Sequence, residues 1–277
     1  MLRERVVTGS VLAAACLAAL FWLPALGWTA LVGFILALAA WEWAGFARCR
    51  TTRARTGYTV ATVAAFVGTA WLMRLPSGAP GTIELLPVYG AAIAFWVIVA
   101  PLWIWRRPSD APAALLLALG WIVLLPAVLA LVHLRNFNPF ALLLFMAMVW
   151  VADIAAYFVG RRFGRLKLAP VVSPGKTWEG LAGAMAAAAV YAVAWTTFYP
   201  HAAPAVLRDI PWSTGAMLLF VEALTVLSVI GDLFESAMKR QAGLKDSGTL
   251  LPGHGGILDR IDALTPVLPA AALVILI

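Results

Sequence analysis

Long apolar runs, separated by short polar segments, recur along the whole chain. Several continue for eighteen or more residues, which is the length expected of a transmembrane α-helix. A membrane β-barrel would instead show short segments of alternating apolar and polar residues. The pattern therefore predicts an all-α, polytopic integral membrane protein with about nine transmembrane helices, at residues 6–23, 27–47, 57–75, 85–105, 112–133, 139–160, 179–199, 213–234 and 261–277.

Composition supports this prediction and narrows the functional classes. Hydrophobic residues make up 63% of the chain and charged residues only 12%, about half the charged share of soluble domains. The net charge of +7 could indicate a nucleic-acid partner, but in a membrane protein it first indicates basic cytoplasmic loops. We therefore expect no nucleic acid. The longest polar segment, of about 25 residues, is too short for a dinucleotide-binding domain, so loops and helix ends would have to hold any nucleotide.

The distribution of the basic residues predicts an orientation. With the N-terminus in the cytoplasm, seventeen of the 20 Lys and Arg residues fall on cytoplasmic segments, and only Arg74, Arg135 and Arg208 fall outside. This asymmetry predicts a multi-pass protein of the cell inner membrane. Loops 161–178 and 235–260 then both face the cytoplasm, where their side chains can form one active site. We divide the chain into an N-terminal transmembrane region, 1–138, with about five helices, and a C-terminal catalytic region, 139–277.

Two carboxylates lie inside predicted transmembrane helices, where a charge costs about 2.5–3.5 kcal/mol near the bilayer centre. Asp153 is either functional or close enough to the cytoplasmic end of its helix to reach water or to pair with Arg161 or Arg162. Glu222 lies in the middle of its span and is either a proton-relay residue or a structural acid. Because its own span contains no basic partner, we favour the structural interpretation for Glu222.

A polar stripe marks the end of the eighth span. Ser228, Asp232 and Ser236 are four residues apart, which places them on one helical face, and Glu235 lies beside them. Such a stripe can be a simple boundary with water. Because this one points toward the charged segment that follows, we favour a functional site.

The segment from Ser173 to Gly180 contains a Gly-Lys-Thr sequence but is not a P-loop, because Pro170 occupies the position of the first required glycine. We predict a helix start, with Ser173 as N-cap and Pro174 at the first helical position. Its free amides and Lys176 could then hold a phosphate. The alternative is a plain helix start whose lysine extends toward water.

The interval from Ser236 to Asp262 concentrates charge between two apolar runs. Three glycines surround His254 and permit positive φ and close approach of a ligand. Asp259 and Asp262 are three residues apart, on one helical face. Carboxylates of this kind suit Mg²⁺, which usually takes one or two of them together with substrate phosphates and water. The sequence shows no His and Cys cluster typical of zinc.

This interval resembles the signature of the phosphatidate cytidylyltransferase family. The matching residues, spread over 27 positions, are Ser236, Lys239, Arg240, Lys245, Asp246, His254, Gly255, Gly256, Asp259, Arg260 and Asp262. The Ser173–Gly180 segment, Gly231-Asp232 and the set Asp153, Tyr157 and Gly160 also resemble the family. One departure is that Ile154-Ala155 stands where the family commonly has a hydroxyl residue and a glycine.

The resemblance implies a reaction in which CTP and phosphatidic acid give CDP-diacylglycerol and pyrophosphate. It also implies Mg²⁺ held by Asp232 and Asp259, and a homodimer in the lipid bilayer. The residues expected to carry catalysis are Lys176, Asp232, Lys239, Arg240, Lys245, Asp246, His254, Asp259 and Arg260; those expected to bind substrate are Ser173, Gly175, Lys176, Thr177, Ser236, Gly255 and Gly256.

Two other functions stay open at this point. A CTP-dependent lipid-alcohol kinase would use the same nucleotide and a similar site. A transporter could use Asp153 and Glu222 as ligands near the bilayer midplane. Against a transporter, the hydropathy pattern shows no repeated pair of broken helices, and the charges gather at one interface.

Overall fold

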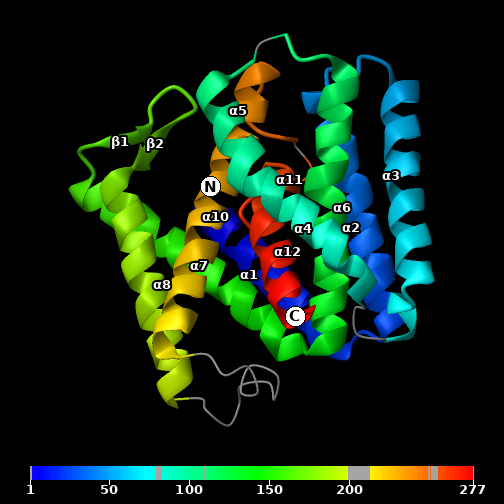
Figure 1. Cartoon of the computed structure of the whole chain (residues 1–277). Coiled ribbons are helices and arrows are strands. Elements are labelled where there is room, and N and C mark those ends of the chain that lie inside the picture. Colours follow the sequence, from blue (N-terminus) through cyan, green and yellow to red (C-terminus); the bar gives the residue numbers. More distant parts are fainter. Residues whose placement is uncertain are drawn as a thin grey trace.

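The computed structural model describes residues 2–78, 83–108, 110–198, 213–248, 250 and 255–276 (Figure 1). Helices dominate it, which confirms the all-α prediction except for one small β hairpin. The elements are α1 Leu2–Trp22, α2 Ala25–Phe46, α3 Thr52–Leu72, η1 Leu75–Ser77, η2 Ile83–Leu85, α4 Leu86–Ala94, η3 Phe95–Val99, α5 Ala100–Arg106, α6 Ala113–Phe137, α7 Pro139–Phe163, β1 Lys167–Ala169, β2 Ser173–Thr177, α8 Trp178–Phe198, α10 Thr214–Gln241, α11 Leu258–Ile261 and α12 Leu264–Leu276.

Five helical segments are long and apolar enough to cross a membrane. They are α2, the continuous segment Ile83–Arg106, α6, α7 and α10; Ala13–Trp22 and Leu264–Leu276 are shorter apolar helices. An α-helix satisfies its own backbone hydrogen bonds and can therefore cross lipid. Several helices of this length and composition indicate a multi-pass membrane protein. The crossing of the membrane by all nine predicted spans stays a prediction.

Both predicted cytoplasmic loops are shorter than the sequence suggested. Helix α7 continues through Phe163, and the rest of the first loop forms an antiparallel hairpin in which Lys167 pairs with Thr177 and Ala169 with Ser173. Helix α10 continues to Gln241. Hydropathy marks where a helix leaves the apolar layer, whereas the helix itself can extend into water with charged side chains. Helices α7 and α10 therefore continue past residues 160 and 234, where the predicted membrane spans end.

A cluster of aromatic rings holds the last turns of α10 in place. Phe234 is 1% exposed, and its ring centroid lies 5.4–6.5 Å from those of Trp43, Phe95, Trp96 and Trp103. These rings come from α2, η3 and α5. Aromatic pairs at such distances add to the free energy of burial. The packing fixes the rotation of α10 and turns the polar residues near Phe234 toward the hairpin and α11.

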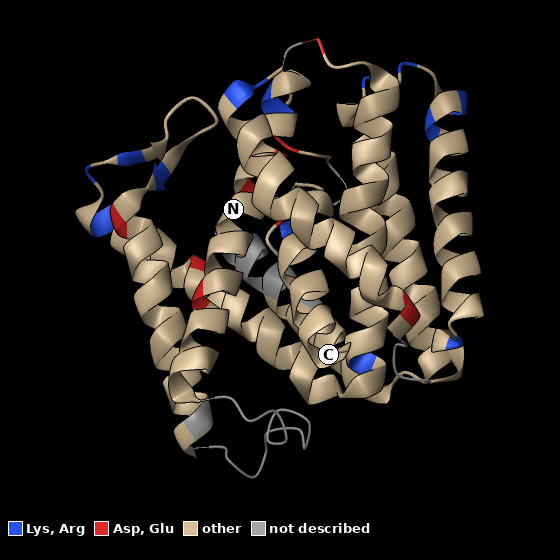
Figure 2. Ribbon diagram, in the orientation of Figure 1, with Lys and Arg blue, Asp and Glu red and all other residues tan. Residues whose placement is uncertain are grey.

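Basic residues gather at one end of the helical bundle. Figure 2 shows most Lys and Arg segments near the hairpin, the end of α5 and the start of α3. At the opposite end, Arg135 donates hydrogen bonds to the carbonyls of Leu20 and Leu23. Arg208, the third residue predicted to lie outside, is not among the described residues. The ends of the bundle therefore differ in charge, as the orientation prediction requires; which end faces the cytoplasm stays a prediction.

Candidate active site at the basic end of the bundle

The segment predicted to start a helix at Ser173 forms strand β2 instead. Its backbone pairs with β1, and the hairpin closes with a bond from the Trp178 amide to the Leu166 carbonyl at 3.0 Å. The hydroxyl of buried Thr177 accepts from the Gly180 amide at 3.1 Å. Thr177 therefore performs at the start of α8 the capping that was predicted for Ser173. Pro174 likewise lies in the strand and not at a first helical position.

Lys176 reaches the carboxylate of Asp232 from this strand. Its Nζ lies 2.5 Å from Asp232 Oδ2, and the two side chains are 23% and 33% exposed. Ser236 donates to the other oxygen, Asp232 Oδ1, at 3.4 Å. The predicted stripe thus exists at Asp232 and Ser236, whereas Ser228 is buried and bonds to the Thr225 carbonyl. Lys176 approaches the site from a strand and not, as predicted, from a helix start.

A second group of charges lies one turn further along α10. The Nζ of Lys239 lies 2.7 Å from Glu235 Oε2 and 2.6 Å from Asp259 Oδ1. Glu235 is only 4% exposed, and Lys239 is the cation that lies against its carboxylate. A buried carboxylate of this kind needs a nearby cation. Lys239 therefore joins the end of α10 to the start of α11.

Asp259 is held by a dense set of donors. Its Oδ2 accepts from the Ser247 amide and hydroxyl, both at 2.9 Å, and from the Gly256 amide at 2.8 Å. Burial raises the pKa of Asp259, but the hydrogen bonds from Lys239 and from the amides outweigh it and hold the pKa below the usual value. The carboxylate therefore stays charged at neutral pH.

Glu42 is a site residue that the sequence reasoning missed. This side chain of α2 is 4% exposed, and it accepts from the Ser247 hydroxyl at 2.9 Å, the Ile257 amide at 3.0 Å and the Leu258 amide at 2.9 Å. Glu42 therefore caps the beginning of α11, and it competes with Asp259 for the single hydroxyl hydrogen of Ser247. The sequence did contain a signal for Glu42, because it is an acid inside the apolar run at residues 27–47, and such acids are usually functional.

Two glycines of the signature allow this close packing. Gly255 has φ +77°, a conformation that other residues adopt at a cost. A Cβ at Gly256 would lie 2.1 Å from Ser247 Oγ and 2.5 Å from either oxygen of Glu42. The predicted positive φ is confirmed at Gly255. The protein groups close to these glycines are the side chains of Asp259, Ser247 and Glu42; the approach of a ligand to this backbone stays a prediction. His254 lies outside the described residues.

Asp153 and Asp262 lie at the edge of the same cluster. Asp153 is within electrostatic range of Lys176 and Asp232, and Asp262 is within range of Asp232, Glu235 and Lys176. The two arginines considered as partners of Asp153 contact other side chains. Arg161 donates to the Tyr157 hydroxyl, and Arg162 lies over the Phe163 ring. Pairing of Asp153 with these two arginines is therefore not seen; because Asp153 has an exposed position, contact with water and a functional role both stay open.

Several predicted residues lie apart from this cluster. Arg240 donates to the Leu244 carbonyl at 3.4 Å and lines a separate pocket beyond the end of α10. The other four have exposed positions, Lys245 and Asp246 on the loop after α10, Gly175 in the hairpin and Arg260 on α11. The structure therefore brings together Lys176, Asp232, Ser236, Lys239, Gly255, Gly256 and Asp259 of the predicted set.

The family was identified by comparison with known proteins. A family model described as "Cytidylyltransferase family" matches residues 3–277. The chain belongs to the cytidylyltransferase family. It is 39% identical to a phosphatidate cytidylyltransferase of Pseudomonas aeruginosa over 98% of this chain and 96% of the relative. The protein of the same name from Haemophilus influenzae is 37% identical over 97% of this chain and 96% of the relative. That of Brucella suis is 38% identical over 99% and 92%.

The side chains of this cytidylyltransferase family member suit a hard divalent cation in combination with a substrate. The candidate ligands Asp232 and Asp259 offer carboxylate oxygens, the type that Mg²⁺ prefers. Within the part of the chain that the structure describes, no three His, Cys, Asp or Glu side chains form a metal-binding group. A cation held by Asp232 and Asp259 would take further ligands from phosphate and water, and it would compete with Lys176 and Lys239 for the carboxylates.

Proposed function

We propose that this chain transfers a cytidylyl group from CTP to phosphatidic acid and releases pyrophosphate. The observation that carries the proposal is the ion pair between Lys239 and Asp259, 20 positions apart in the signature, beside the pair of Lys176 and Asp232. Full-length relatives named phosphatidate cytidylyltransferase support it. The product is CDP-diacylglycerol, a phospholipid precursor, and the enzyme is a nucleotidyltransferase.

The reaction needs positioning and charge neutralisation more than proton transfer. A phosphate oxygen of phosphatidic acid, already anionic, attacks the α-phosphorus of CTP. The bond from that phosphorus to the oxygen bridging toward the β-phosphorus breaks, and pyrophosphate leaves with the bond electrons. Lys176 and Lys239, held at their carboxylates at 2.5 and 2.6 Å, offer ammonium groups to two polyanions that repel each other. Such alignment and neutralisation dominate phosphoryl-type transfer.

Mg²⁺ is the cofactor that we propose for this site. Asp232 and Asp259 would hold it, and it would supply Lewis-acid stabilisation of charge on the triphosphate. Ser247 and Gly256 keep Asp259 charged and oriented through their hydrogen bonds at 2.8–2.9 Å. Supporting groups of this kind set metal affinity by orienting the ligand.

Labelled CTP tests the function directly. Membranes containing the chain are incubated with phosphatidic acid and with CTP labelled either in the cytosine ring or at the γ-phosphate, and lipids are then extracted. Cytidylyl transfer places only the ring label in lipid and the γ label in pyrophosphate. A lipid-alcohol kinase would place only the γ label in lipid, and a transporter would label neither. The names of the relatives favour the first result over both alternatives.

We further propose that the basic end of the bundle faces the cytoplasm in the cell inner membrane, and that the chain is a homodimer. The support for the orientation is the concentration of Lys and Arg near the hairpin (Figure 2). Phosphatidic acid can reach that end from the cytoplasmic leaflet and CTP from the cytosol. The homodimer rests on the family resemblance.

Cysteine labelling tests this orientation. With the free Cys16 and Cys49 replaced by Ala, we expect Arg165→Cys, between α7 and β1, to react with a membrane-impermeant maleimide only after the cells are opened. The matched position at the other end is Trp22, 82% exposed, and Trp22→Cys should react in intact cells. The opposite labelling pattern would reverse the proposed topology.

Lys176→Ala should weaken the use of substrate more than it weakens folding. The substitution removes a charged contact of the kind worth about 1.5–3 kcal/mol, so we expect KM for CTP or phosphatidic acid to rise about tenfold or more. Because Lys176 is 23% exposed, its removal leaves no buried cavity. Steady-state kinetics of the purified variant, together with its melting temperature, provide the measurement. Unchanged kinetics would leave Lys176 with only a structural ion pair.

A further inference from the structure

An exposed surface lies where α7 ends and α8 begins, at the base of the β hairpin; we call it the junction surface. Its large apolar side chains are Phe163, Leu166 and Trp178, which are 61%, 65% and 55% exposed. Leu166 and Trp178 meet across the base of the hairpin, where the Trp178 amide donates to the Leu166 carbonyl at 3.0 Å. Large apolar groups that gather on an exposed surface usually have a partner there.

The same surface carries most of the positive charge of its segment. Residues 161–180 contain five Lys and Arg and one acid, Glu179. Lys176 points away from the junction to Asp232, and Glu179 lies within electrostatic range of Arg165. The basic residues of the junction surface, all exposed, are Arg161, Arg162, Arg165 and Lys167. With four basic residues and one acid, the junction surface is positive.

Aromatic neighbours orient two of these arginines without neutralising them. Arg161 donates to the Tyr157 hydroxyl at 2.8 Å, and its guanidinium carbon lies 5.9 Å from the centre of the same ring. The guanidinium carbon of Arg162 lies 5.5 Å from the centre of the Phe163 ring. Both rings are uncharged, so these contacts hold apolar and cationic groups side by side and leave the positive charge in place.

An exposed apolar stripe of α7 leads to this surface. Trp150, Ile154 and Phe158 are exposed, and residues four apart are neighbours on a helix surface. Arg162 is the next position of that stripe. Because α7 is long and apolar enough to span a membrane, we expect the stripe to face lipid tails. Arg162 then lies where the tails end and the headgroups begin.

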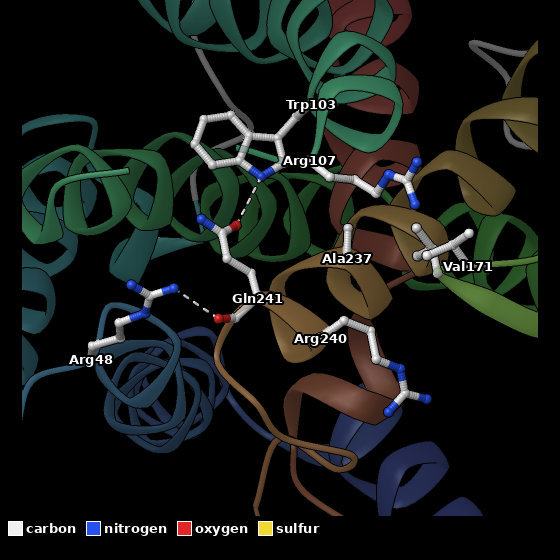
Figure 3. Close-up of a pocket in the computed structure, with 8 residues that line it drawn as sticks. Arg48, Trp103, Arg107, Val171, Ala237, Arg240 and Gln241 are labelled. Atoms are coloured by element: carbon white, nitrogen blue, oxygen red, sulfur yellow. Dashed lines mark hydrogen bonds between the residues drawn. The ribbon is translucent and has the colours of Figure 1, made fainter. Parts of the chain in front are cut away.

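The hairpin is held beside the bundle at its turn as well as at its base. Figure 1 shows it next to the ends of α7 and α8, at the side of the bundle. Val171 and Val172 of its turn line a pocket together with Trp103 of α5 and Ala237 of α10 (Figure 3), and Val172 is buried. The junction surface is therefore part of a supported element at the edge of the bundle.

We propose that the junction surface lies in the headgroup layer of the bilayer and binds anionic phospholipids there. Tryptophan, phenylalanine and leucine next to Lys and Arg are the combination found in segments that lie at the membrane interface. Basic clusters beside a spanning helix attract anionic lipids, and guanidinium groups bind phosphate oxygens through charge-assisted hydrogen bonds.

This contact has a consequence for the reaction, which rests on the proposed function. Strand β2 continues from the hairpin turn to Lys176, which contacts Asp232. A hairpin fixed at headgroup depth would hold Lys176 at the depth where the phosphate of phosphatidic acid lies, and the positive surface would raise the local concentration of that anionic lipid.

Fluorescence quenching measures the contact with lipid. In the full chain with Cys16 and Cys49 replaced by Ala, an environment-sensitive fluorophore is attached at Leu166→Cys. The control is Thr52→Cys, an exposed position at the start of α3. Arg50 and Arg53 lie near it, but no large apolar side chain is exposed between Phe34 and Val60, a stretch that the structure describes throughout. The protein is reconstituted in phosphatidylcholine vesicles that contain either phosphatidylglycerol or phosphatidylcholine with brominated acyl chains as quencher.

We expect both brominated lipids to quench the label at Leu166→Cys, the phosphatidylglycerol more strongly, and neither to quench the label at Thr52→Cys to a similar extent. If the Leu166→Cys label is quenched no more than the control, the surface faces water and the proposal is wrong. Equal quenching by the two brominated lipids would exclude the preference for anionic lipid.

Matched charge variants test the basic residues. Arg162→Gln combined with Arg165→Gln should raise the fraction of brominated phosphatidylglycerol needed for half-maximal quenching by about fivefold or more, since each basic residue near an anionic surface contributes about that factor. Arg50→Gln combined with Arg53→Gln removes the same charge at the start of α3 and should change nothing. Quenching by brominated phosphatidylcholine should persist in both double variants, which shows that the surface is still folded at the bilayer. An equal shift in both would mean that only total charge matters, and the junction surface would lose its assignment.

These measurements use neither CTP nor phosphatidic acid, so a chain that makes no CDP-lipid would refute the proposed function and leave this result standing. In an active chain, Arg162→Gln with Arg165→Gln should raise KM for phosphatidic acid and not KM for CTP. If the quenching shifts while both KM values stay unchanged, the surface binds anionic lipid but does not supply the substrate.

Discussion

Replacing Asp232 or Asp259 by Asn is expected to lower synthesis of CDP-lipid by roughly 10²–10³-fold, because a bound metal supplies several kcal/mol of transition-state stabilisation. Each change removes one negative charge and keeps the shape of the side chain. At Asp232 it also weakens the contact with Lys176 at 2.5 Å, and at Asp259 it weakens the contact with Lys239 at 2.6 Å. Activity as a function of Mg²⁺ concentration is the measurement.

The combination of changes tests whether the two carboxylates act as a unit. The double variant should lose little more activity than either single variant, since both changes disable the same site. Asp262→Asn is the matched control, because one oxygen of Asp262 accepts from the Ala263 amide at 2.8 Å and the residue is not a proposed ligand. A milder loss is expected there. Near-normal activity and Mg²⁺ dependence in both single variants would place the metal elsewhere.

Glu42→Gln should lower activity by about 10–100-fold, although Glu42 contacts neither proposed metal ligand directly; supporting groups around metal ligands have effects of this size. The amide retains one acceptor oxygen and replaces the other by a donor, facing the Ser247 hydroxyl or the amides of Ile257 and Leu258. An unsatisfied buried donor is costly. The loop would shift and change the orientation of Asp259.

The Mg²⁺ concentration for half-maximal activity distinguishes positioning from general destabilisation. It should rise in Glu42→Gln, and Glu42→Asp, which keeps the charge, should recover part of the effect. Glu222→Gln is a matched control, because Glu222 is another acid within a transmembrane helix, roughly 15 Å from Asp232 along α10 at 1.5 Å per residue. We expect Glu222→Gln to keep most of its activity. If Glu42→Gln leaves the Mg²⁺ dependence of activity unchanged, Glu42 does not position the metal ligand and has only a structural role.

The apolar pattern of the chain predicted the helical architecture well, because the cost of burying backbone polar groups in lipid leaves few alternatives. It predicted helix ends poorly. Ser236, Lys239 and Arg240 are polar, so hydropathy assigned them to a loop, whereas they continue α10 to Gln241. The error matters, since the helical spacing of Glu235 and Lys239 is what allows them to form an ion pair at 2.7 Å.

The signature placed Lys239 and Asp259 in one site, but it predicted neither their pairing nor what completes the site. Lys239 and Asp259 are both signature residues, and they are in contact. Glu42 lies more than 200 positions before its partners, a distance at which one sequence carries no pairing signal. The strand at Ser173–Thr177 was also missed, because Ser-Pro is typical of a helix start and the pairing with β1 depends on residues outside that motif.

The contact between Glu42 and the loop before α11 has a consequence for biogenesis. Residues 205–216 positions later in the chain supply its hydrogen-bond donors, so translation at 5–20 residues per second leaves the acid without them for about 10–40 s after α2 has been made. During that interval Glu42 must be protonated, hydrated or shielded by the insertion machinery. The candidate site is therefore completed late, when Ser247, Ile257 and Leu258 reach α2, and a nascent chain that ends before Ser247 lacks all three of these donors to Glu42.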